Sequence, residues 1–282
     1  MNAKDFELLT TVLKKRSGLQ LSQDKIYLLE SRLTPLARRR GMNSLDELLA
    51  LLHRGAPEDL LKEITEAMTT NESFFFRDQT PFDIFQKEVL PGLRERRASR
   101  KKLRIWCAAA SSGQEPYSLA MILKEQGAQW DGWSIEIIGT DISKEVLHKA
   151  EAGLYSQFEV QRGLPIQLLI KYFQQTGEMW QLAQSIRSMV QFREYNLLDS
   201  LTMLGQFDVI FCRNVLIYFD QPTKADVLQR MSGIMPPDGS LFLGAAETVL
   251  GISDRFKPVR GLRGLYVMAG AEEAAQQTAA AG

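Results

Sequence analysis

The hydrophobic pattern of the first 70 residues predicts a small, all-helical unit. Apolar residues recur there every three or four positions, as they do on the buried face of an amphipathic helix. Glycines separate these runs, and residues that commonly begin helices precede them. We therefore expect four short helices. The runs begin at Phe6 and continue through residues 26–36, 45–52 and 60–68.

From Leu103 onward the pattern changes to short apolar runs that alternate with helical periodicity. The runs LRIWCAA, WSIEIIGTD, FDVIFCRN and SLFLGAAE have the length and composition of buried strands. Strands that alternate with helices form a mainly parallel sheet covered on both faces. The fold class expected for this part is α/β, a Rossmann-like doubly wound sheet.

The two patterns define domain boundaries. We expect a helical N-terminal domain over 1–70, a linker with a connecting helix over 71–90, and the α/β domain over 91–270. A stretch at about 153–195 interrupts the strand and helix alternation and is expected to be a small inserted β-subdomain. The last residues, 271–282, have no apolar face to bury, so we expect a disordered tail.

Composition narrows the chemistry. The chain has 34 basic and 34 acidic residues, which argues against general nucleic-acid binding, and two histidines, which makes a histidine-rich metal centre improbable. Both cysteines lie in apolar runs and are expected to be buried free thiols. No apolar run is long enough to span a membrane, so a cytoplasmic protein without direct membrane insertion is expected. The basic stretch from Arg94 to Arg104 could be a local binding patch, or it could equally well be ordinary solvated surface charge.

Polar side chains follow the predicted strands, where ligands of doubly wound sheets bind. Glu115 suits a cationic amino group, although it could also be an ordinary first-turn acid. Asp141 suits ribose hydroxyls, and helix capping is the alternative. Asn196 could contact the adenine or the ribose. Arg213 and Asn214 end another strand, and burying that pair without a partner is costly.

Several longer strings together resemble the CheR-type chemotaxis-receptor glutamate O-methyltransferases. They are TTNESFFFRD, AAASSGQEPYSLA, TDIS, NLLD, FCRNVLIYFD and PPDGSLFLGAAE, and they occur in family order from about residue 5 to 268. The resemblance implies that the α/β domain is an S-adenosylmethionine-dependent methyltransferase that produces S-adenosylhomocysteine and uses no metal. It implies cofactor contacts from Asn71, Ser73, Arg77, Glu115, Asp141, Asn196, Leu197, Arg213 and Asn214.

Ser73 stands where the family often has threonine, a change that keeps the hydroxyl group. We expect Arg77 and Tyr218 to contact the substrate carboxylate, although Tyr218 could simply be a core aromatic residue. A glutamate side chain has a pKa of about 4.3 and is already ionised at neutral pH, so this reaction needs no general base. Positioning of the carboxylate against the methyl group is then the main catalytic requirement.

The resemblance also implies a partner, the acidic helical cytoplasmic bundle of methyl-accepting chemotaxis receptors. The basic end of the second predicted helix could read that surface through Arg32, Arg38, Arg39 and Arg40, or these side chains could merely favour the helix dipole. Some family members bind a receptor pentapeptide through a longer glycine-bearing hairpin. The corresponding stretch here is short and contains only Gly177, so we expect no pentapeptide tether, and we expect a monomer.

Two other functions fit the same residues. One is a methyltransferase that acts on a small molecule or a nucleic acid and uses the helical domain as a lid. The other is an S-adenosylmethionine-binding signalling adaptor without catalytic activity, which the full set of polar residues argues against.

Overall fold

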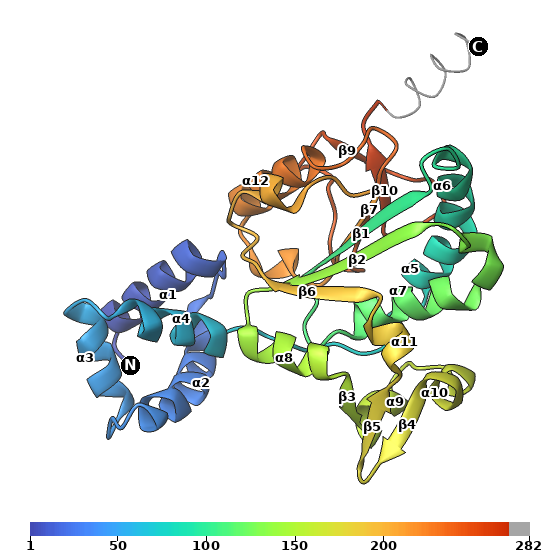
Figure 1. The fold of residues 1–282 in the computed structure, drawn as a ribbon. Coiled ribbons are helices and arrows are strands. Elements are labelled where there is room, and N and C mark those ends of the chain that lie inside the picture. The colour runs from blue at the N-terminus through green and yellow to red at the C-terminus, as the bar shows by residue number, and fades with distance from the viewer. Residues whose placement is uncertain (271–282) are drawn as a thin grey trace. The chain divides into compact units, whose positions relative to one another are not determined.

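A computed structural model describes residues 1–270, and the predicted tail at 271–282 lies outside the described residues. The chain divides into two compact units. The first contains residues 1–70 together with 218–223. The second contains residues 71–217 and the chain from residue 224 onward. Figure 1 traces both along the chain.

The first unit is helical, as its apolar periodicity predicts. Leucines from all four helices form its core, and Leu9, Leu29 and Leu33 are completely buried. Ser44 begins α3 by accepting a hydrogen bond from the backbone N–H of Glu47, a common N-cap arrangement. The helices are α1 (Ala3–Ser17), α2 (Ile26–Arg39), α3 (Leu45–His53) and α4 (Glu58–Ala67), with a 3-10 turn at Gln23–Lys25.

A short segment from much later in the sequence, residues 218–223, belongs to this helical unit. The backbone N–H of Gln20 donates to the carbonyl oxygen of Tyr218 at 2.9 Å, and Lys14 forms an ion pair with Asp220 at 2.7 Å. Gly18 ends α1 with a φ of 75°, and a Cβ there would approach the Phe219 ring to 3.0 Å. Local patterns give no sign of this grouping because its contacts join residues about 200 positions apart.

The second unit contains a seven-stranded sheet in the order β6-β2-β1-β7-β8-β10-β9. The neighbouring strands from β6 to β8 pair in parallel, and β10 runs antiparallel to both β8 and β9. This confirms the Rossmann-like α/β fold class. The strands are β1 (Lys102–Ala108), β2 (Ser134–Asp141), β6 (Val190–Glu194), β7 (Val209–Cys212), β8 (Ser240–Leu243), β9 (Phe256–Pro258) and β10 (Leu265–Met268).

Helices cover both faces of this sheet. On one side lie α5 (Thr80–Ile84), a π-helical turn (Phe85–Val89), α6 (Leu90–Arg96) and α7 (Gln114–Glu125), and on the other side lies α12 (Gln221–Ser232) (Figure 1). The rings of Phe85, Phe211 and Phe242 pack together beneath the first group. Trp106 stacks on Phe207 elsewhere in the core. Tight burial of both faces keeps the strand ends, and the loops that follow them, in fixed positions.

A small β-subdomain is inserted between β2 and β6, after α8 (Lys144–Ala152). It has a three-stranded antiparallel sheet in the order β3-β5-β4. Gly177 and Glu178 form the short turn between β4 and β5. Val190–Glu194, which the predicted insertion included, forms the edge strand of the main sheet. The subdomain contains β3 (Leu154–Ser156), α9 (Gln157–Gln161), α10 (Ile166–Tyr172), β4 (Phe173–Thr176), β5 (Met179–Leu182) and α11 (Gln184–Arg187).

Candidate functional site

The parallel strands β6, β2, β1, β7 and β8 bring their carboxyl ends to one edge of the sheet. The strand order reverses at β1, because the chain continues to β2 on one side of it and later to β7 on the other. Open α/β sheets bind their ligands at such a point. The loops that follow these five strands are therefore where a functional site is expected, and they carry most of the predicted site residues.

The loop after β1 turns sharply. Ala109, Ser111 and Gly113 have φ values of 59°, 51° and 91°, in the left-handed region that only glycine adopts freely. A Cβ at Gly113 would lie 3.0 Å from both Ala150 and Tyr117, so the position also lacks space for a larger residue. The hydroxyl group of Ser111 donates to the carbonyl oxygen of Asn71 at 2.8 Å. This bond holds predicted cofactor residue Asn71 against the loop.

Asp141 links the loops after β1 and β2. Its side chain is buried, and its two oxygens accept hydrogen bonds from the backbone N–H groups of Ser111 at 2.9 Å and Ser143 at 3.0 Å. The alternative interpretation of Asp141 as a helix cap is wrong, because Ser143 is the N-cap of α8 and accepts from Val146. Asp141 therefore holds the two loops together at the carboxyl edge of the sheet.

Arg213, the residue after β7, joins three parts of the site. Its side chain is 1% exposed. It donates to Glu115 at 2.9 Å, and at 2.8 Å to both the carboxylate of Asp78 and the backbone oxygen of Arg77. Its Nε is buried and makes no hydrogen bond within the described residues. The guanidinium group therefore fixes the turn around Arg77 and keeps one donor unpaired.

Burial raises the pKa of Glu115, and the charge of Arg213 opposes that rise. Glu115 lies in the first turn of α7, where the helix dipole favours negative charge. Cys107 and Cys212 are free and buried, as predicted, and burial raises the pKa of both thiols. High thiol pKa values make nucleophilic catalysis by cysteine unfavourable here.

The segment that carries Arg77 has an unusual backbone. Phe76, Asp78 and Gln79 have φ values of 51°, 67° and 46°, which are costly for residues other than glycine. Arg77 itself donates to the backbone oxygen of Glu72 at 2.9 Å, and its guanidinium carbon lies 5.4 Å from the centre of the Phe74 ring. Such strain persists only where neighbouring groups hold it, and Arg213 supplies two of the bonds.

The remaining predicted cofactor residues have varied surroundings. Asn196 accepts a hydrogen bond from the N–H of Leu198 at 3.0 Å, which shapes the loop after β6. Leu197 is buried. Ser73 is half-buried. Asn214 is half-buried and has a φ of 60°. Tyr218 belongs to the other unit, so its distance from Arg77 is not determined and its role stays a prediction.

The four arginines predicted to read a receptor differ in their contacts. Arg32 donates to the backbone oxygens of Met68 and Thr69, both at 2.8 Å, and Arg40 pairs with Glu63 and Asp59. Arg32 therefore stabilises the end of α4, and Arg40 stabilises the packing of α4 against α2. The side chains of Arg38 and Arg39 are exposed and form no hydrogen bond or close ion pair among residues 1–270, although the charge of Arg39 helps to lower the pKa of Glu63. They remain available for a partner.

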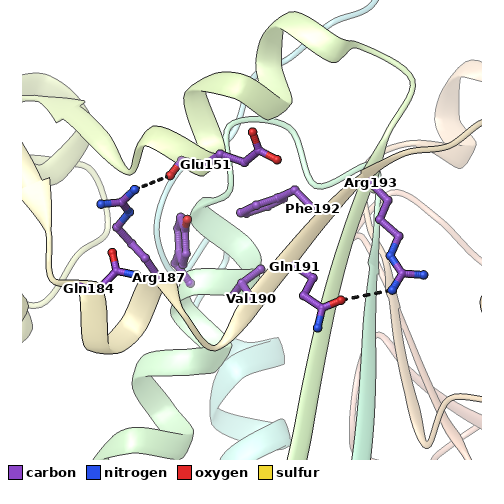
Figure 2. Close-up of a pocket in the computed structure, with 8 residues that line it drawn as sticks. Glu151, Gln184, Arg187, Val190, Gln191, Phe192 and Arg193 are labelled. Carbon is purple, nitrogen blue, oxygen red and sulfur yellow. Dashed lines mark hydrogen bonds between the residues drawn. The ribbon is translucent and has the colours of Figure 1, made fainter.

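A shallow pocket of about 450 Å³ lies elsewhere, beside the amino end of β6 (Figure 2). Arg187 donates to the backbone oxygen of Glu151 at 2.8 Å, and Arg193 donates to Gln191 at 3.1 Å along one wall. Phe192 points toward its centre (Figure 2). None of the predicted site residues lines it. This pocket is therefore separate from the site at the carboxyl ends of the strands.

Two residues of the site were not predicted. Asp78 directly follows Arg77, and a non-glycine residue held in a strained turn has no clear local signature. Glu247 follows β8, and its carboxylate bonds to the loop after β7. Like Asp141, it is an acidic residue near the carboxyl end of a parallel strand. A search of the residues at the end of the predicted strand SLFLGAAE would therefore have found it.

Comparison with known proteins agrees with this geometry. Residues 4–69 match the all-alpha domain of CheR methyltransferase, and residues 71–264 match its SAM binding domain. Chemotaxis protein methyltransferase 1 of Pseudomonas aeruginosa is 42% identical over 94% of this chain and 97% of its own length. Cher2 of Pseudomonas putida is 39% identical over 94% and 98%. Chemotaxis protein methyltransferase 1 of Vibrio cholerae is 40% identical over 88% and 90%.

The residues at the carboxyl edge fit S-adenosylmethionine. Glu115 and Asp141 are carboxylates suited to its amino group and its ribose hydroxyls, and Arg213 Nε is a buried donor still unpaired. Residues 1–270 contain no cluster of histidine, cysteine or acidic side chains that could hold a metal ion, and no helix among them could cross a membrane. The chain belongs to the CheR methyltransferase family and is an S-adenosylmethionine-dependent methyltransferase.

Proposed function

We propose that this enzyme transfers the methyl group of S-adenosylmethionine to the side-chain carboxylates of specific glutamates on chemotaxis receptors. The products are glutamate γ-methyl esters and S-adenosylhomocysteine. The names of relatives that are about 40% identical support a role in chemotaxis. Each transfer removes one negative charge from the receptor, which is a suitable chemical basis for sensory adaptation.

One observation favours a carboxylate substrate over a hydroxyl or an amine. The site lacks a histidine that could act as a base. His53 bonds to Asp5 at 2.9 Å in the helical unit, and His148 is an exposed residue of α8. A glutamate with a pKa of about 4.3 needs no deprotonation at neutral pH, whereas an alcohol or an ammonium group does.

In this proposal the cofactor supplies the electrophilic methyl group, and the protein positions and shields the reacting groups. Glu115 binds the cationic amino group and Asp141 binds the ribose hydroxyls. Asn71, Ser73, Asn196, Leu197, Arg213 and Asn214 complete the cofactor contacts. Arg77 and Tyr218 orient the substrate carboxylate, because a guanidinium and a phenol are suitable donors to it.

The helical unit is proposed to recognise the receptor. Arg38 and Arg39 support this role because both are exposed and unpaired at the end of α2. Two adjacent cations would attract an acidic helical bundle, and they would act mainly on the association rate. Arg32 and Arg40 already have partners within the protein and are weaker candidates.

We also propose that recognition needs no pentapeptide tether and that the enzyme acts as a monomer. The turn between β4 and β5 contains only Gly177 and Glu178, which supports the absence of an extended docking hairpin. Calorimetry with a receptor C-terminal pentapeptide should show no micromolar binding. A receptor that lacks its last residues should be methylated normally, and loss of methylation would contradict this proposal.

Labelled S-adenosylmethionine, added with the enzyme to a lysate without endogenous activity, tests the function. The label should enter acidic helical receptor proteins and leave RNA and metabolites unlabelled. Label in RNA or a small molecule would instead support a methyltransferase of another substrate class. Cofactor binding without any labelled product in the presence of receptors would support a catalytically silent adaptor.

A further inference from the structure

Glu247 connects the loops after β7 and β8 through its carboxylate. One oxygen accepts from the N–H groups of Asn214 at 2.8 Å and Gly244 at 2.6 Å. The other accepts from Val215 at 2.9 Å and Ile217 at 3.3 Å. A carboxylate has about four acceptor positions. All of them are used by the backbone, so Glu247 is built to hold loops rather than to bind a ligand.

The loop that Glu247 holds is strained at Asn214. The φ of 60° lies in the left-handed region, which is unfavourable for a residue with a side chain and needs support from its surroundings. Glu247 binds the N–H of Asn214 and the two N–H groups that follow nearby. Gly244 allows the close approach, because a Cβ there would lie 2.7 Å from the Glu247 oxygen and 2.8 Å from Asn214 Nδ2.

This loop leaves β7 at the point where the strand order reverses. The side-chain amide of Asn214 forms no hydrogen bond within residues 1–270, and the adjacent Arg213 Nε is buried without a partner. The loop thus carries two unpaired polar groups in a backbone conformation that the chain would not adopt unaided. A ligand-binding loop with these properties depends on whatever fixes its backbone.

We propose that Glu247 is a positioning residue that acts through Asn214, holding the loop after β7 in the conformation that binds the cofactor. The inference rests on the cofactor contact proposed for Asn214. It assigns a function to the carboxylate at the end of SLFLGAAE, whose two oxygens accept from four backbone N–H groups. The geometry predicts that, once Glu247 is replaced, exchanging Asn214 for alanine causes little further loss of cofactor affinity.

A double-mutant cycle on the full chain tests this proposal. The dissociation constant for S-adenosylhomocysteine is measured by calorimetry for wild type, Glu247→Gln, Asn214→Ala and the double variant. Glutamine replaces one oxygen by an N–H donor, so two backbone N–H groups lose their partner. Each single variant should bind about tenfold more weakly, and the double variant should bind within about threefold of the weaker single. Asp254→Asn is the control, because Asp254 is exposed and its side chain forms no hydrogen bond or ion pair among the described residues, and it should bind like wild type.

The opposite results are equally clear. If Glu247 affects binding independently of Asn214, its replacement weakens binding by the same factor in both backgrounds, and the proposal is overturned. Unchanged binding by Glu247→Gln also overturns it. If Glu247→Gln does not fold, Glu247→Asp replaces it in the same cycle, because the shorter side chain withdraws the carboxylate from the four backbone N–H groups. Absence of binding by the wild type would instead overturn the cofactor contacts on which the proposal rests.

Discussion

Arg213 donates a hydrogen bond to Glu115 at 2.9 Å, joining the end of β7 to the first turn of α7 across the reversal in strand order. The two residues are 98 positions apart in the sequence. Breaking a buried pair by removing one partner costs about 3–5 kcal/mol, because the other charge stays buried without compensation. The pair therefore fixes the end of β7 against α7 at the carboxyl edge of the sheet.

Replacing Asp141 by alanine should weaken binding of S-adenosylhomocysteine by about 1–3 kcal/mol. The variant loses the hydroxyl acceptor and also the bonds to Ser111 and Ser143 that hold two loops. Asp141→Asn is the matched variant, because it keeps one acceptor oxygen and should lose less affinity. Calorimetry measures both, and an unaltered affinity for Asp141→Ala would remove the residue from the cofactor site.

Replacing Arg38 and Arg39 by alanine should raise the KM for receptor and leave the affinity for S-adenosylhomocysteine unchanged. The wild-type rate should fall with added salt, because screening over about 8–10 Å weakens attraction between exposed charges. Steady-state kinetics at several salt concentrations measures the effect, with Arg260→Ala as an exposed control. Normal kinetics at every ionic strength would show that α2 does not read the receptor.

Replacing Asp208 by alanine should lower the free energy of unfolding by about 3–5 kcal/mol. The buried carboxylate accepts from Arg97 at 2.8 Å, from Arg100 at 2.6 Å and from the backbone N–H of Arg104 at 2.9 Å. Urea unfolding measures the change. The exposed Asp254→Ala variant should lie within about 0.5 kcal/mol of wild type. An equally small effect at Asp208 would show that the network contributes little.

The ion pair between Lys14 and Asp220 should make the free energy of unfolding vary with pH. Lys14, helped by Thr223, lowers the pKa of Asp220 from 3.8 to about 2. A lowered carboxylate pKa stabilises the fold above the ordinary pKa, and this contribution is lost as the pH falls through about 4 toward 2. Lys14 is exposed, so Lys14→Met should cost less than about 1 kcal/mol at pH 7.

The difference in unfolding free energy between wild type and Lys14→Met should shrink as the pH falls from about 5 to about 2. Lys15→Met serves as the control, because Lys15 is also exposed and is unpaired among the described residues. A difference that stays constant over this pH range would show that the ionised state of Asp220 is not what Lys14 stabilises.

The sequence predicts much of the fold because its signals are local. Leucine spacing identifies the four helices of the first unit, and apolar runs identify the parallel strands. Polar residues at strand ends such as Asp141 and Arg213 could also be selected, since parallel strands share one carboxyl edge. The stretch from Arg94 to Arg104 shows the limit. Arg96, Arg97 and Arg100 pair with Asp208 and Asp238, which lie more than 100 positions away and cannot be chosen as partners from the pattern alone.

The same limit applies at the site. Arg32 and Arg40 have the spacing expected of a charged helix surface, yet both bond to the end of α4 or to its side chains. Glu247 lies in a string that could be recognised, but its four backbone contacts appear only when β7 and β8 pair side by side. Contacts between distant segments therefore decide which charged residues are structural and which remain available.

The most direct test of the account is to identify the methylated atom on a receptor. Purified enzyme, S-adenosylmethionine and a soluble receptor cytoplasmic fragment are incubated together, and the peptides are analysed by mass spectrometry. Single added methyl groups should appear on glutamate side chains and disappear after mild base, as esters do. Arg77→Ala, compared with Arg77→Lys, should reduce their formation. Methyl groups on lysine, arginine or histidine, or a receptor that remains unmodified while the enzyme turns over another substrate, would contradict the account.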